Sequence, residues 1–180
     1  PKAIQIRKTV AAADVAIRGL HGVTMVVGRP ERTVELMTGM LGFEVMDETG
    51  GRVRLAVNGS VPGKFIDLLH DTGAGPAKNG LGTVHHVAMA IGGDEGQREL
   101  REELLARGYQ VTAVMDRQYF RSIYFREPGG VLFEVATAGP GFSVDESPAL
   151  LGCALKLPPW EEVNRPAIEE ELPRLLPVRS

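Results

Sequence analysis

The stretch Val84-His85-His86-Val87-Ala88-Met89 has the alternating pattern of a β-strand, and a similar stretch, Leu20-His21-Gly22-Val23-Thr24-Met25, stands earlier in the chain. Two further segments recur in the same order, with offsets of about 64 to 67 residues. The recurring pairs are Leu41-Gly42-Phe43-Glu44-Val45 with Arg107-Gly108-Tyr109-Gln110-Val111, and Pro62-Gly63-Lys64-Phe65-Ile66-Asp67 with Pro128-Gly129-Gly130-Val131-Leu132-Phe133-Glu134. The repeat predicts two copies of one structural module.

Each copy is predicted to run strand, helix, strand, strand, strand. Pro30 begins the first helix and Gly42 ends it, because proline suits a first helical turn and glycine a C-terminal stop. In the second copy Asp94 is the predicted N-cap, Gln97 completes a capping box, and Gly108 stops the helix. The helical apolar stripes are Val34, Met37, Met40 and Leu41 in the first copy, and Leu100, Leu104 and Leu105 in the second.

These patterns predict an α+β fold with two tandem βαβββ modules, at residues 18–72 and 82–137. We expect the modules to form an open, cleft-containing, β-barrel-like sheet. Residues 1–17 are a predicted linker or edge segment, residues 73–81 join the modules, and residues 138–180 form a Pro-rich C-terminal tail. A short helix is predicted from Pro166 to Leu176 within that tail.

Composition narrows the classes of function. The 180 residues carry a net charge of −3 and no basic stripe, which argues against nucleic acid as a partner. No apolar run is long enough to span a bilayer, and the one cysteine, Cys153, suits a cytoplasmic protein. The chain begins at Pro1, without an initiator Met, so we expect a trimmed or expressed fragment, or a processed chain. Exposed sheet edges favour a homodimer.

Strand alternation separates a packing face from a cleft face. In the first strand of the second copy, His85, Val87, Met89 and Ile91 suit packing against the helix, whereas His86, Ala88 and Ala90 suit an open face. In the last strand Val131, Phe133 and Val135 suit packing, whereas Leu132, Glu134 and Ala136 face the other way.

His86 and Glu134 therefore fall on matching faces of one module. A glutamate in so apolar a strand is costly to bury without a partner, and a metal ion supplies one. Taken singly, a strand histidine is more often a hydrogen-bonded residue and a strand glutamate is more often solvated. Their coincidence predicts two ligands of a three-ligand metal site, with the third not evident in this chain.

The repeated unit, with His on its first strand and Glu on its last, resembles the vicinal oxygen chelate superfamily. That superfamily includes glyoxalase I, bleomycin-resistance proteins and extradiol dioxygenases. Within it, the chain is similar to the hydroquinone-type ring-cleaving dioxygenases over essentially its whole length. The segments that carry the resemblance are Arg18-Gly19-Leu20-His21, Phe65-Ile66-Asp67-Leu68-Leu69-His70, Val84-His85-His86-Val87-Ala88, Asp116-Arg117-Gln118-Tyr119-Phe120, Ser122-Ile123-Tyr124-Phe125-Arg126, Pro128-Gly129-Gly130-Val131-Leu132-Phe133-Glu134 and Gly141-Phe142-Ser143-Val144-Asp145-Glu146.

The resemblance implies a parent enzyme with four βαβββ modules, of which this chain is the C-terminal half. In that family a His of the first module and a His and a Glu of the fourth hold iron, and the last two correspond to His86 and Glu134. Gly22 occupies the position equivalent to His86 in the earlier copy. The resemblance thus places the third ligand in a missing N-terminal half, and implies that this chain alone is inactive or weakly active.

The resemblance also suggests three catalytic residues. Tyr124 corresponds to a tyrosine near substrate oxygen and is expected to donate a hydrogen bond there, although a packed strand tyrosine is the alternative. Arg117 is expected to hold phenolate charge, with a surface pair to Asp116 as the alternative. His85 corresponds to a histidine that often lies behind the metal ligands, yet its own strand face suits the core.

The implied function is ring cleavage of aromatic diols by O2, in the degradation of aromatic compounds. Fe(II) is the expected metal, Mn(II) is a plausible substitute, and the substrate is hydroquinone or catechol-like. Two other functions stay open. One is another metal-dependent reaction of the superfamily, a glyoxalase-type isomerase or lyase with a site assembled from Asp67, His86 and Glu134. The other is a non-catalytic module that binds an aromatic ligand without metal.

Overall fold

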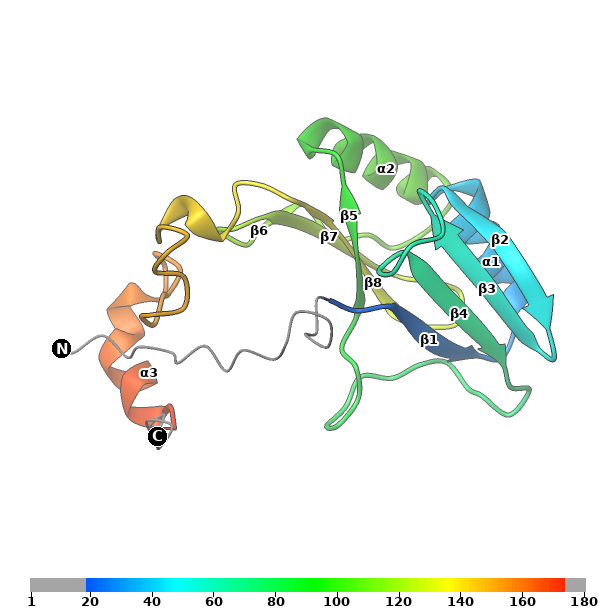
Figure 1. Ribbon diagram of the computed structural model, residues 1–180, viewed down its shortest axis with the longest axis horizontal. Helices are drawn as coiled ribbons and strands as arrows, with labels where there is room; N and C mark the ends of the chain where they lie inside the picture. Colours follow the sequence, from blue (N-terminus) through cyan, green and yellow to red (C-terminus); the bar gives the residue numbers. More distant parts are fainter. Residues whose placement is uncertain (1–18, 174–180) are drawn as a thin grey trace.

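The computed structural model describes residues 19–173 and contains the predicted repeat. The first module consists of β1 (Gly22–Val27), α1 (Pro30–Gly39), β2 (Phe43–Thr49), β3 (Arg52–Val57) and β4 (Phe65–His70). The second consists of β5 (Val87–Ile91), α2 (Asp94–Ala106), β6 (Met115–Asp116), β7 (Arg121–Arg126) and β8 (Leu132–Thr137). Figure 1 shows α2 lying along one face of the second sheet, with the first sheet and α1 to one side.

Both modules have the same strand topology. The first sheet has the order β1-β4-β3-β2 and the second the order β5-β8-β7-β6. In each, the first and last strands of the module pair in parallel, while the remaining neighbours pair antiparallel. The α+β class and the tandem βαβββ arrangement are confirmed. The strands of the described residues nevertheless form two separate four-stranded sheets and do not close into a barrel.

One apolar core joins the modules. One buried cluster contains Met37 of α1 and Leu104 of α2 together with apolar residues of β3, β4, β7 and β8. A polar contact crosses the same boundary, since the Thr33 hydroxyl of α1 donates to Glu127 Oε2 at 2.6 Å, with both residues buried. Glu127 also accepts from the Val131 amide at 2.9 Å, so it ties the β7–β8 turn to α1.

The helix ends differ in part from the prediction. The predicted capping box is wrong, because Gly93 lies at the N-cap of α2 and no side chain caps that end. Gln97 is instead buried, and its amide donates to the carbonyls of Arg121 and Val135 at 2.8 Å each. Leu105, predicted in the apolar stripe, is 42% exposed, whereas Leu104 is fully buried. Helix α1 ends at Gly39, before the predicted stop at Gly42.

Two strands of the second module are shorter than the repeat predicts. β5 begins at Val87, so Val84, His85 and His86 precede the paired strand. β6 has two residues, where β2 of the first module has seven. Thr112 interrupts the strand pairing here, because its hydroxyl oxygen, and not a backbone carbonyl, accepts from the Tyr124 amide at 3.0 Å. The Thr112 carbonyl accepts instead from the Arg101 side chain at 2.7 Å.

The tail lies beyond the end of the second sheet that is remote from the first sheet (Figure 1). Its helix α3 spans Arg165–Glu171, shorter than the predicted 166–176, because Leu172 is extended before Pro173. The predicted linker at residues 1–17 lies outside the described residues. Within residues 19–173, no helix combines the length and apolarity needed to cross a membrane.

Candidate metal centre

Glu134 is at the centre of the candidate site. It lies in the middle of β8, opposite Ala88 of β5 on one side and Tyr124 of β7 on the other. Its neighbours in β8, Phe133 and Val135, are buried in the core, so alternation directs Glu134 to the opposite face. The residue is only 4% exposed. A carboxylate so shielded needs hydrogen-bond donors or a cation.

Three side chains meet the Glu134 carboxylate. Oε1 accepts from the Ser122 hydroxyl and, at 2.7 Å, from the Tyr124 hydroxyl. Oε2 lies 2.7 Å from His86 Nε2. The two hydroxyls come from alternate positions of β7, so the strand geometry aims both at the same oxygen. The carboxylate therefore has one oxygen held by neutral donors and one oxygen facing the imidazole.

His86 is the residue just before β5, and its side chain extends to Glu134. Its side chain is 32% exposed, and its ring lies edge-on to that of Tyr124 with centroids 6.0 Å apart. Its second nitrogen, Nδ1, lies 2.7 Å from Nδ1 of His85. The expected juxtaposition of His86 and Glu134 is present in the structure, and their role as metal ligands stays a prediction.

The two side chains fit a metal ion as neighbouring ligands. Imidazole nitrogen and carboxylate oxygen are the donors of non-heme Fe(II) sites. Two ligands at right angles, with bonds of about 2.1 Å, lie about 3 Å apart, close to the observed separation of His86 Nε2 and Glu134 Oε2. Among residues 19–173, no group of three or more His, Cys, Asp or Glu side chains is arranged to hold a metal. The described residues thus offer two candidate ligands, His86 and Glu134.

Arg117 is brought to the same site, whereas the orientation predicted for His85 is wrong. The Arg117 guanidinium lies 5.4 Å from the centroid of the Tyr124 ring. Asp116, the alternative partner of Arg117, accepts instead from the Gln118 amide at 2.7 Å. His85 is exposed, and its contact with His86 replaces the predicted packing in the core. Catalytic roles for Tyr124, Arg117 and His85 remain predictions.

The first module has a different set of residues at the equivalent positions. Asp67 pairs with Thr24 and Arg54 in the same registers in which Glu134 pairs with Ala88 and Tyr124. By the same registers Arg52 corresponds to Ser122, and Gly22 corresponds to His86. The two sheets therefore carry matching carboxylates, one beside neutral hydroxyls and an imidazole, the other beside two guanidinium groups.

Both oxygens of Asp67 are occupied by arginines. Oδ1 accepts from Arg54 Nε at 2.8 Å, and Oδ2 accepts from Arg54 and Arg52, also at 2.8 Å each. The hydrogen bond from Arg54 is the main cause of a lowered Asp67 pKa, and Arg52 adds to it against the opposing effect of burial. The site of Asp67, His86 and Glu134 expected for a glyoxalase-type reaction is not assembled in residues 19–173.

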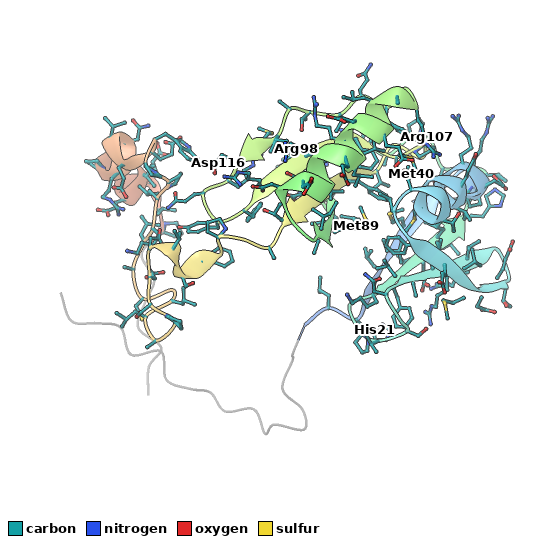
Figure 2. All side chains as sticks on the ribbon, turned by 90° about the horizontal axis from the view of Figure 1, so that it is seen from above. His21, Met40, Met89, Arg98, Arg107 and Asp116 are labelled. Atoms are coloured by element: carbon teal, nitrogen blue, oxygen red, sulfur yellow. The ribbon has the colours of Figure 1, made fainter. Side chains whose placement is uncertain are left out.

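A groove of about 1000 Å³ lies beside the candidate site, between the modules. Gly22 and Phe65 line it from the first sheet, and His86 lies on its wall. Figure 2 labels two further lining residues, Met40 near the end of α1 and Met89 beneath α2. Glu134 and Tyr124 are not among the lining residues, so the groove adjoins the His86–Glu134 pair and does not contain it.

The sequence model of the Glyoxalase/Bleomycin resistance protein/Dioxygenase superfamily matches residues 19–135, which include the first module, the second module as far as Val135, and the His86–Glu134 pair. The chain belongs to this superfamily. The match agrees with the tandem modules seen in the structure. FosX from Listeria monocytogenes, a fosfomycin resistance protein whose crystal structure contains Mn(II), shares the fold at a TM-score of 0.56 with 22% identity, covering 68% of this chain and 92% of that one.

Members of this superfamily with higher identity are named as dioxygenases. "Putative ring-cleaving dioxygenase MhqO" of Bacillus subtilis is 42% identical over 159 residues, which are 88% of this chain and 50% of that protein. "Chlorohydroquinone/hydroquinone 1,2-dioxygenase" of Sphingobium indicum is 34% identical over 168 residues, 91% of this chain and 50% of that protein. A crystal structure described as a putative dioxygenase from Bacillus subtilis matches with a TM-score of 0.84 and 40% identity, covering 93% of this chain and 53% of that one. The chain spans about half the length of these relatives.

Sequence reasoning missed three residues around the two carboxylates. No role was predicted for Ser122, Arg52 or Arg54. The repeat contained the signal that finds them, because Arg52 and Arg54 alternate before Asp67 as Ser122 and Tyr124 alternate before Glu134. Aligning the third strands of the two copies, as well as the first and last, would have paired these residues.

We expect Asp67→Asn to lower the free energy of unfolding at pH 7 by about 1–2 kcal/mol, because it leaves two guanidinium groups without their carboxylate. The lowered pKa means that ionised Asp67 stabilises the fold above its ordinary pKa of 3.8. That contribution is lost as the pH falls through the lower, folded-state pKa. The difference in unfolding free energy between the wild type and Asp67→Asn, measured by urea denaturation, is therefore expected to narrow as the pH is lowered below 3.8.

Glu103→Gln is the matched control, since Glu103 pairs with Arg107 on the exposed face of α2. It is expected to change the unfolding free energy by less than about 0.5 kcal/mol. An Asp67→Asn protein as stable as the wild type at pH 7 would contradict the account of this cluster.

Proposed function

We propose that this chain is the C-terminal half of a non-heme Fe(II)-dependent dioxygenase that opens the ring of an aromatic diol with O2. The observation that carries the proposal is the contact between His86 and the buried Glu134, on the open face of the second sheet. Relatives named as ring-cleaving dioxygenases, one of them a hydroquinone 1,2-dioxygenase, support the reaction and the substrate class. Hydroquinone and catechol-like compounds are the proposed substrates.

The proposal places the third iron ligand in a segment that precedes this chain. Two observations support such a segment. The chain matches about half the length of its relatives. Within residues 19–173, β1 and β5 each pair with one neighbour only, and the free edge of each strand is one that another strand can cover. A second copy of the chain is the other proposed source of a covering strand.

Fe(II), when bound, would supply electron transfer between the aromatic diol and O2, and Mn(II) suits the same ligands. His86 and Glu134 would hold the ion at the open face of the sheet. Ser122 and Tyr124 keep the Glu134 carboxylate fixed by donating to Oε1, which leaves Oε2 directed at the site. Such donors to a ligating carboxylate tune both its orientation and its basicity.

Tyr124 and Arg117 are the proposed catalytic residues. Tyr124 is half-buried and its ring borders that of His86, so its hydroxyl lies beside the metal ligands. In the complex with substrate, its single O–H would turn from Glu134 Oε1 to a substrate oxygen, while Ser122 continues to donate to Oε1. The Arg117 guanidinium over the Tyr124 ring supplies a positive charge near the ionised hydroxyl of the substrate. His85 contacts His86 and not the open face, so its proposed role is to orient that ligand.

Oxygen uptake with hydroquinone and catechol tests the proposal, in proteins loaded anaerobically with Fe(II). The polypeptide encoded by the natural gene is expected to consume oxygen, while the 180-residue chain does so weakly or not at all. His86→Ala and Glu134→Ala are each expected to reduce uptake by at least about 100-fold, because each removes a ligand. His70→Ala, an exposed histidine at the end of β4, is the control and retains activity.

Equal uptake by the 180-residue chain would contradict the proposed origin of the third ligand. No uptake by either protein, together with tight binding of an aromatic ligand in the absence of metal, would contradict the dioxygenase and support a binding module.

We expect Tyr124→Phe to lower kcat by about 100-fold while Fe(II) binding falls much less, since the hydroxyl acts mainly on substrate oxygen. Steady-state oxygen uptake and titration with Mn(II) separate the two effects. Tyr109→Phe is the matched control, because Tyr109 packs against Phe125 on the opposite side of the sheet. Loss of metal binding equal to the loss of kcat would assign Tyr124 to support of Glu134 alone.

A further inference from the structure

The segment that joins the modules in the structure, residues 71–86 between β4 and β5, is packed against both of them. On the first module, the Asp71 amide donates to the Val27 carbonyl at 3.1 Å, and a Cβ on Gly28 would lie 2.7 Å from the Ala74 carbonyl oxygen. On the second, the Ala77 amide donates to the Gly129 carbonyl at 2.9 Å. The joining segment therefore has a fixed path to the β7–β8 turn.

This segment leads directly to His86, which lies outside the paired residues of β5 and β8. The pairing of β5 with β8 begins at Val87 opposite Phe133, so the backbone of His85 and His86 lies before the first paired residue. A metal ligand must be held to within fractions of an ångström of its working position. Some other contact has to fix the backbone at this point.

Asn79 makes that contact. Its side-chain amide donates to the His85 carbonyl at 2.6 Å, across a turn that Thr83 closes with its own hydrogen bonds to Gly80. The side-chain oxygen of Asn79 accepts in turn from Arg126 NH2 at 2.9 Å. Arg126 is anchored at the other end, since its NH1 donates to the Gly130 carbonyl at 2.6 Å.

The anchoring turn is itself shaped for the joining segment. Gly130 has a φ of 90°, a conformation that favours glycine, and a Cβ there would lie 2.8 Å from the Ala77 nitrogen. A side chain at this position would push the segment away from the turn. The close approach places Asn79 within reach of Arg126 at the end of β7.

We propose that Asn79, held by Arg126, is a positioning residue for His86, and that the joining segment thereby sets the geometry of the metal ligand. This inference rests on the function proposed above. The amide side chain is required because it accepts from Arg126 and donates to the His85 carbonyl at the same time. His85 then transmits the position to His86 through the backbone and through the contact between their Nδ1 atoms.

Asn79→Asp separates the two contacts. The carboxylate keeps the bond with Arg126 but has no N–H for the His85 carbonyl, so only the contact toward His86 is lost. Asn79 and Arg126 are exposed, and exposed substitutions usually change stability little. An effect on the metal ligand is therefore separable from an effect on folding. Arg126→Met is the second variant, since it releases Asn79 from the opposite side.

The test uses the polypeptide encoded by the natural gene and three measurements. Mn(II) affinity, measured by the EPR signal of free Mn(II), is expected to fall about tenfold in Asn79→Asp and Arg126→Met. The nuclear Overhauser effect between the His86 and Tyr124 rings, measured without metal, is expected to weaken in both variants. The thermal midpoint is expected to stay within about 2 °C of the wild type. Asn164→Asp, an exposed asparagine before α3, is the matched control and changes none of the three.

A variant that unfolds at a lower temperature, with unchanged Mn(II) affinity and unchanged ring contact, would overturn the positioning role. A wild type that binds no Mn(II) would count against the proposed function instead. In that case the ring contact alone decides, because it reports the position of His86 in the absence of metal.

Discussion

The burial of the Glu134 carboxylate is the constraint on which the second module depends. A charge at 4% exposure is unfavourable unless donors surround it, and Ser122, Tyr124 and His86 supply them. These donors come from β7 and from the residue just before β5, and β5 and β7 are the strands that flank β8. The parallel pairing of β5 with β8 is what brings His86 alongside, because it aligns the start of one strand with the start of the other. The burial of Glu134 thus requires both the strand topology of the module and the polar side chains at the centre of its open face.

The two modules surround their buried carboxylates with different kinds of partner. Asp67 and Glu134 occupy equivalent registers on the two sheets. Asp67 is balanced by the permanent charges of Arg52 and Arg54, which take up both of its oxygens. Glu134 faces two neutral hydroxyls and a histidine, so its Oε2 has no permanently charged partner among the described residues. A divalent cation suits the second arrangement and is opposed by the two guanidinium groups of the first. Gly22, without a side chain at the place of His86, adds to the difference.

The features that followed from the sequence are those set by periodicity. Two-residue alternation separated Phe133 and Val135 from Glu134, and the internal repeat predicted that each module runs strand, helix, strand, strand, strand. The features that did not follow depend on contacts between distant segments. Gln97 has the spacing of a capping box, yet it is buried and serves two carbonyls of β7 and β8, a role that only the packed structure reveals. The pairing of β5 with β8 begins only at Val87, and the contact of Asn79 with His85 stands in place of the pairs that would precede it.

Paramagnetic broadening by Mn(II), followed by NMR in the 180-residue chain, tests most directly whether the two carboxylates differ as described. The account predicts that the ring signals of His86 and Tyr124 are lost first as Mn(II) is added. The guanidinium signals of Arg52 and Arg54 are expected to persist at the same Mn(II) concentration, because Asp67 is already neutralised. Broadening that begins at Arg52 and Arg54, or that leaves His86 and Tyr124 unchanged, would contradict it.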